Sequence, residues 1–126
     1  MLVPPAYELT YAEDGDREVR LWRAGERTLK SDWGDESVVT GGRRARWEGD
    51  IDWRLCEVMV GGYRAQVVTY QTQKGYFVVE AFWADLPSTD WRTGGIRPAL
   101  WIVATGPDRA AQRQALAIVR TVTFAR

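Results

Sequence analysis

The strongest secondary-structure signal in the chain lies between Tyr76 and Ala84, which read Tyr-Phe-Val-Val-Glu-Ala-Phe-Trp-Ala. Aromatic and β-branched residues dominate this run, and they favour a strand. Alternate residues of a strand point to opposite sides of a sheet. One face then carries Phe77, Val79, Ala81 and Trp83, and the other carries Tyr76, Val78, Glu80 and Phe82. Because both faces are largely apolar, we expect the second one to be closed by further chain, a partner or a ligand.

Other runs with strand character surround this one and are separated by turns. They are Tyr7–Tyr11, Glu18–Arg23, Ser37–Thr40, Trp53–Val60, Tyr63–Gln73 and Pro98–Thr105. Asp14-Gly15 predicts a hairpin between the first two runs, and Gly61-Gly62 and Lys74-Gly75 turn the chain later. Ser31–Glu36 reads as a loop, and the basic cluster Arg43–Trp47 is expected to begin a strand.

The end of the chain predicts a helix. Gly106-Pro107-Asp108 is typical of a helix start, and apolar residues then recur at helical spacing. These are Ala111, Ala115, Ile118, Val119 and Val122. Thr121–Phe124 is β-branched and is expected to continue as a short strand. We therefore predict one α+β domain over residues 1–126, a meandering antiparallel sheet with a C-terminal amphipathic helix on one face.

The composition excludes several classes of function. The chain has 17 basic and 17 acidic side chains, one cysteine and no histidine. Zero net charge argues against a nucleic acid partner, and no histidine base, histidine metal ligand or internal disulfide is available. We expect no cofactor and no metal.

The sequence offers no transmembrane segment, because its longest uncharged run lies between Arg97 and Asp108 and a spanning helix needs about 20 residues. The start of the chain lacks the features of a signal peptide. The location reads as cytoplasmic for the sequence as written, or as a secreted or lipoprotein domain if a leader has been removed.

Three segments together resemble a known fold: the hairpin around Gly61-Gly62, the hairpin around Lys74-Gly75, and the ending Gln112–Phe124. This order of elements, over about residues 53–126, resembles the PsbP-like superfamily. That group includes an extrinsic photosystem II protein, a nuclear Ran-binding import factor and many bacterial lipoproteins. The resemblance implies a docking or binding protein, and the group has no shared catalytic residues to carry over.

Seven tryptophans are the most unusual feature of the composition. Tryptophan is enriched at interaction hot spots, although it also fills cores. We expect the ring of Trp22 outside the core, and Trp33 and Trp91 in loops. The arginine cluster Arg43, Arg44 and Arg46 beside Trp47 would bind phosphate or an acidic partner, or form a solvated strand edge. The candidate binding residues are Trp22, Trp33, Arg44, Trp47, Tyr76, Phe82 and Trp91.

Catalytic residues are not predicted. Glu48, Asp50 and Asp52 read as solvated loop acids rather than as an acid/base pair or a metal site, because carboxylates are mostly exposed. Cys56 alternates with Val58 and is expected in a buried strand as a small apolar residue.

The sequence therefore predicts a non-catalytic interaction module that presents an aromatic sheet face or loops to a protein partner or to its own copy. The alternative is a carrier of an apolar or lipid-like ligand, and a carboxylate-based hydrolase is a remote third. A carrier should show a closed apolar cavity of roughly 300 Å³ or more between sheet and cover, a docking module a flat exposed patch, and a hydrolase two converging carboxylates.

Overall fold

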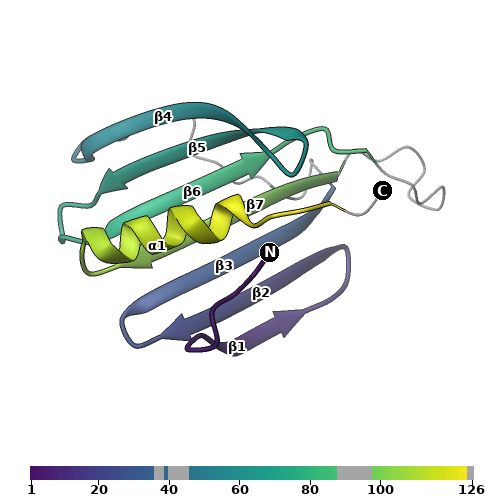
Figure 1. The fold of residues 1–126 in the computed structure, drawn as a ribbon, viewed down its shortest axis with the longest axis horizontal. Helices are drawn as coiled ribbons and strands as arrows, with labels where there is room; N and C mark the ends of the chain where they lie inside the picture. The colour runs from purple at the N-terminus through teal and green to yellow at the C-terminus, as the bar shows by residue number, and fades with distance from the viewer. Residues whose placement is uncertain (36–38, 40–45, 88–97, 125–126) are drawn as a thin grey trace.

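The computed structural model describes residues 1–35, 39, 46–87 and 98–124. The elements along these residues are β1 (Glu8–Glu13), β2 (Arg17–Ala24), β3 (Arg27–Asp35), β4 (Ile51–Val60), β5 (Tyr63–Gln71), β6 (Phe77–Trp83), β7 (Pro98–Gly106) and α1 (Arg109–Arg120). The strands form one antiparallel sheet, and α1 lies across one of its faces (Figure 1). The predicted α+β class, with an antiparallel sheet and a C-terminal helix, is confirmed.

The sheet consists of two meanders joined through its last strand. The order is β1-β2-β3-β7-β6-β5-β4, so β7 lies in the middle and pairs with both β3 and β6. Leu100 is opposite Trp33 on one side and opposite Trp83 on the other. The same strand order places β1 and β4 at the two edges of the sheet.

The helix approaches the sheet closely at its first turn. Asp108 caps the helix, its side chain accepting a hydrogen bond from the backbone N–H of Ala111 at 2.8 Å. A Cβ atom at Gly106 would overlap the Cβ of Ala111, so this position requires glycine. Small residues therefore allow α1 to lie directly on β6 and β7.

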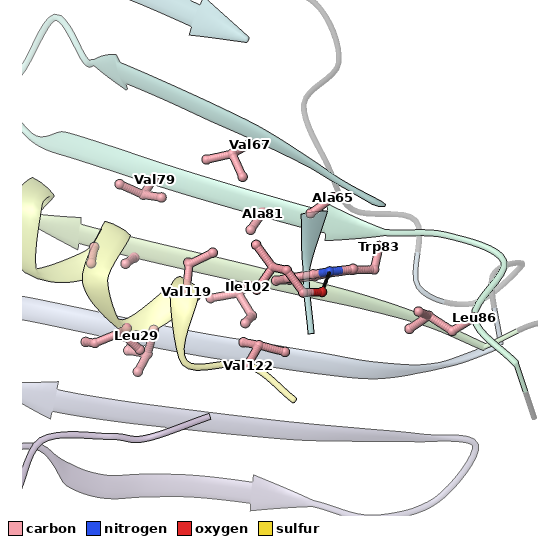
Figure 2. Packing of buried hydrophobic residues seen from close by; sticks show 14 residues of the cluster. Leu29, Ala65, Val67, Val79, Ala81, Trp83, Leu86, Ile102, Val119 and Val122 are labelled. Carbon is pink, nitrogen blue, oxygen red and sulfur yellow. Dashed lines mark hydrogen bonds between the residues drawn. The ribbon is translucent and has the colours of Figure 1, made fainter. Parts of the chain in front are cut away.

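The helix covers an apolar core that includes Val79, Ala81 and Trp83, which share one face of β6 as the alternation predicted. Figure 2 shows Val119 of α1 above this cluster. The Trp83 ring is fully buried, and its Nε1 donates a hydrogen bond to the carbonyl of Val60 at 3.3 Å (Figure 2). Trp83 therefore belongs to the core on the helix side.

Residues of the same chain close the second face of β6. Phe82 is 4% exposed and packs with Val39 and Ala99, while Trp53 packs against the cluster that contains Val78. This face therefore presents no flat aromatic surface, and the expectation that Phe82 contacts a partner is wrong, because its ring is already covered.

A polar residue at the centre of the second face is satisfied internally. Glu80 is buried, and its carboxylate accepts hydrogen bonds from the Tyr70 hydroxyl at 2.7 Å and from Trp101 Nε1 at 3.2 Å. Buried polar groups are normally paired in this way. The glutamate on this face is thus part of the fold.

The structure corrects the prediction of a loop at Ser31–Glu36, because Ser31 to Asp35 belong to β3. Strand pairing with β2 and β7 overrides the weak local preference of these polar residues. Asp32 is buried, and its carboxylate lies 3.3 Å from the guanidinium of Arg17. Gly34 leaves room for the Arg17 side chain, since a Cβ there would lie 2.8 Å from the Cβ of Arg17.

Three smaller expectations also change. Val122 to Phe124 form no strand, although Val122 is buried. Arg46 and Trp47 precede β4 and do not begin it, and the rest of the basic cluster lies outside the described residues. Of the short strand expected near Val39, that residue alone is described, and it is not in a strand.

Cys56 is exposed, which contradicts its expected burial. The strand itself is placed as predicted, but β4 is an edge strand, and α1 packs mainly on β6 and β7. Local alternation cannot distinguish an edge strand from a central one.

We expect Gly106→Ala to lower the free energy of unfolding by about 1–3 kcal/mol, because the added methyl group would push α1 away from β7. Gly15→Ala is the matched control, since a Cβ at Gly15 meets no atom within 4 Å, and should change stability by less than about 0.5 kcal/mol. Urea unfolding of both variants measures the difference. Equal stabilities would contradict the close approach of helix and sheet.

We expect Trp83→Ala to cost about 3–5 kcal/mol, because it leaves a large cavity under α1. Trp83→Phe keeps most of the ring and loses the hydrogen bond to Val60, so its cost should be clearly smaller. Urea unfolding measures both variants. A loss of less than about 1 kcal/mol for the alanine variant would place the ring outside the core.

Candidate functional site

Strands β2 and β3 bring two of the candidate binding residues to one surface. Trp22 is opposite Leu29, and Trp33 is opposite Glu18 in the same ladder. This register puts Trp22, Ser31 and Trp33 on the helix side of the sheet. The half-buried ring of Trp22 packs against the core, so the expectation that it lies outside the core is wrong.

The segment before β1 forms one wall above these strands, and two anchors hold it against the helix. The backbone N–H of Leu2 donates to Thr121 Oγ1 at 2.8 Å, and the Tyr7 hydroxyl donates to Gln114 Oε1 at 3.2 Å. The guanidinium of Arg27 also donates to Gln114. Burial raises the pKa of the Tyr7 hydroxyl, and the nearby charge of Arg27 opposes that shift.

The segment after α1 forms the opposite wall and ends in an aromatic cluster. The Phe124 ring makes edge contacts with Tyr63 and Trp83, at centroid distances of 5.4 and 5.8 Å, and lies 6.4 Å from Trp33. Gly61 has φ +64°, and a Cβ there would lie 2.8 Å from the carbonyl oxygen of Val122. The β4–β5 turn therefore helps to fix the position of this segment.

The two terminal segments and the sheet line an open pocket of about 380 Å³. Its lining residues are Met1, Val3, Trp22, Ser31, Trp33, Leu100, Ile102, Val122, Thr123 and Phe124. Nearly all of them are apolar, Ser31 and Thr123 supply hydroxyl groups, and none carries a side-chain charge. The volume lies within the range typical of small-molecule sites.

The other candidate binding residues are dispersed. Trp47 is 63% exposed in the turn before β4, where its backbone N–H donates to Asp50 Oδ2 at 2.9 Å. Tyr76 is 49% exposed and borders a more polar hollow of about 490 Å³ together with Arg23 and Thr28. Arg44 and Trp91 lie outside the described residues.

Three carboxylates that an acid/base mechanism could have used, Asp50, Asp52 and Glu80, each have a structural partner. Asp50 is buried and caps the turn at Trp47, while Asp52 pairs with Arg109 at 2.9 Å. Glu80 is held on the opposite side of the sheet from α1 by Tyr70. These side chains do not converge in one cleft, so their arrangement gives no support to a hydrolase mechanism.

Sequence reasoning missed the two terminal walls of the pocket. Met1 and Val3 begin the chain as an apolar run, and Phe124 follows the helix as a large aromatic residue. These were the available signals. Nothing in their local pattern indicates that residues more than 100 positions apart meet on one sheet.

No family model, curated protein or solved structure matches this chain. The resemblance to the PsbP-like superfamily therefore stays a prediction. In the part of the chain that the structure describes, no helix is both long and apolar enough to cross a membrane. Within the same residues, no three acidic or thiol side chains gather where they could hold a metal ion.

We expect Trp22→Ala to cost roughly 1–3 kcal/mol of stability, less than a fully buried tryptophan would, because its ring is only half buried. Trp47→Ala is the control and should change stability by less than about 0.5 kcal/mol. Urea unfolding compares them. If Trp22→Ala left the free energy of unfolding unchanged, the ring would lie outside the core, as the sequence predicted.

Proposed function

We propose that this protein is a non-catalytic binding module and that the pocket lined by Trp22, Trp33 and Phe124 takes an uncharged apolar ligand. The observation that carries the proposal is the apolar pocket of about 380 Å³. Its volume exceeds the roughly 300 Å³ expected of a carrier, but it is an open pocket and not the closed cavity expected from the sequence. The pocket lies on the helix side of the sheet, and not on the second face of β6 where the alternation had suggested it.

The chemistry of the lining indicates the class of ligand. Aromatic rings give a ligand large apolar contact area at low cost in side-chain entropy, and they stack on flat or aliphatic groups. None of the lining side chains carries a charge that could compensate a charged ligand group, so burying such a group against them would be unfavourable. The buried part of the ligand should therefore be an aromatic ring or a short alkyl chain, with at most one hydroxyl or carbonyl group directed at Ser31 or Thr123.

The fold supports this role because the pocket is built on a rigid base. Its floor consists of neighbouring strands β2, β3 and β7, and its walls are fixed by the hydrogen bonds at Thr121 and Gln114. A site whose lining is held in place before binding loses less entropy when a ligand enters.

A fluorescent probe tests the proposal. N-phenyl-1-naphthylamine is uncharged and aromatic, and its emission rises in apolar surroundings. We expect it to bind with one-to-one stoichiometry. Ser31→Leu should fill the pocket floor with apolar atoms and weaken binding at least tenfold, a change equivalent to about 1.4 kcal/mol.

Trp47→Ala is the matched control for this experiment, since Trp47 is exposed and does not line the pocket. Its affinity for the probe should equal that of the unaltered protein. Circular dichroism and urea unfolding of each variant establish that the fold is kept. Absence of binding to the unaltered protein, or undiminished binding to the Ser31→Leu variant, would refute the proposal.

A further inference from the structure

Strand β4 is an edge strand with apolar side chains exposed on both of its faces. The exposed fractions are 44% for Ile51, 39% for Leu55, 41% for Val58 and 66% for Met59. No other strand of the described residues pairs with its outer side. A long apolar edge of this kind is a template for pairing with another strand.

The opposite edge of the sheet is built differently. β1 has six residues, with Glu8 and Glu13 at its ends and a bulge between Leu9 and Tyr11. Charges, short length and bulges are the usual protections of a sheet edge. The ten residues of β4 carry one irregularity, which lies before Arg54 and leaves the rest of the strand regular.

The hairpin turn determines which backbone groups of β4 point outward. Gly61 and Gly62 both have positive φ and connect Val60 to Tyr63 by a two-residue turn. In such a hairpin the flanking residues form a hydrogen-bonded pair, and every second residue along the strand then bonds to the partner strand. The backbone N–H and C=O groups of Leu55, Glu57 and Met59 therefore face away from β5 and are available to another strand.

We infer that β4 pairs antiparallel with β4 of a second copy of this chain, about a two-fold axis at Cys56. A two-fold axis perpendicular to a continuous sheet passes midway between the two edge strands. It can place any one residue of the strand directly opposite its own copy. An axis at Arg54 or at Glu57 would place like charges directly opposite each other, which is unfavourable. An axis at Cys56 avoids both conflicts and pairs residues 54–58 of each copy within the regular part of β4, with Trp53 and Met59 at the two ends.

The register about Cys56 also suits the most exposed side chain of the strand. Met59 comes opposite Trp53 of the second copy, and both lie on the face of the sheet away from α1. Contacts between a thioether and an aromatic ring are favourable. An axis at Val58 would instead place Met59 opposite Glu57, and an axis at Leu55 would place Met59 opposite Ile51, beyond the irregularity of β4. We therefore place the axis at Cys56.

A second copy is the occupant because the strand complements itself. Val58 of each copy comes opposite Arg54 of the other, and Leu55 comes opposite Glu57, so neither charge meets its like. A symmetric pairing of this type uses the same surface on both chains and stops at two copies. The β2–β3 side of the sheet, which bears the ligand pocket, takes no part, so this inference is independent of the proposed function.

Charge variants at one position test both the dimer and its register. Under reducing conditions, sedimentation velocity over a range of concentrations should show a reversible dimer. Val58→Arg would bring two arginines opposite Arg54 residues, whereas Val58→Glu would create two favourable pairs. We expect the dimer dissociation constant of the arginine variant to be at least tenfold higher than that of the glutamate variant.

Matched controls lie on the other edge of the sheet. Leu9 is 50% exposed on β1, and Leu9→Arg and Leu9→Glu alter the net charge by the same amounts as the variants at Val58. Neither should change the dissociation constant. A monomer at all concentrations, or a dimer that both Val58 variants weaken equally, would overturn the inference.

Cross-linking provides a second measurement of the register. Opposed residues at a non-hydrogen-bonded position have Cα atoms about 4.5 Å apart, which is within the range of a disulfide. Diamide should join the two Cys56 thiols, accepting the two electrons and two protons that they release. A dimer in solution without this disulfide-linked product would overturn the two-fold axis at Cys56, and Cys56→Ser should abolish the product.

Discussion

The structure depends on the close contact of one short helix with the middle of a wide sheet. An α-helix is about 10 Å wide and strands are about 4.8 Å apart, so a single helix covers about two strands. Gly106 and the alanines of α1 allow that contact, and they place the helix on β6 and β7. The strands on either side of this pair need other cover.

The strands on the two sides of this pair are covered to different extents, and each candidate site lies where the cover is incomplete. Over β2 and β3, the segments before β1 and after α1 meet through the hydrogen bond from Leu2 to Thr121. They cover the strands incompletely and leave the apolar pocket. On the other side no comparable segment of the described residues covers β4, so Val58 stays exposed. One uncovered region suits a small ligand, and the other suits a strand.

Several of the tryptophans contribute to the packing of the fold and do not form an exposed surface. Trp83 fills the core beneath the helix, Trp53 packs on the second face of β6, and Trp101 donates a hydrogen bond to the buried carboxylate of Glu80. The apolar second face of β6 is thus explained by the monomer itself. A binding role now depends on the pocket and on the edge strand, since the aromatic face that first suggested it is buried.

The sequence alone determined the elements with a strong local period: the hairpins, the apolar faces of β6, and the helix with its start at Asp108. It also identified Trp22 and Trp33, but it placed one outside the core and the other in a loop. Tertiary structure decided that β7 lies between the two meanders, that Ser31–Asp35 form a strand, and that Cys56 lies on an edge. Alternation fixes which residues share a face, whereas the position of a strand within a sheet depends on pairing between distant segments. Met1 and Phe124 line the same pocket for the same reason. Their proximity results from the path of the whole chain, and neither local sequence indicates it.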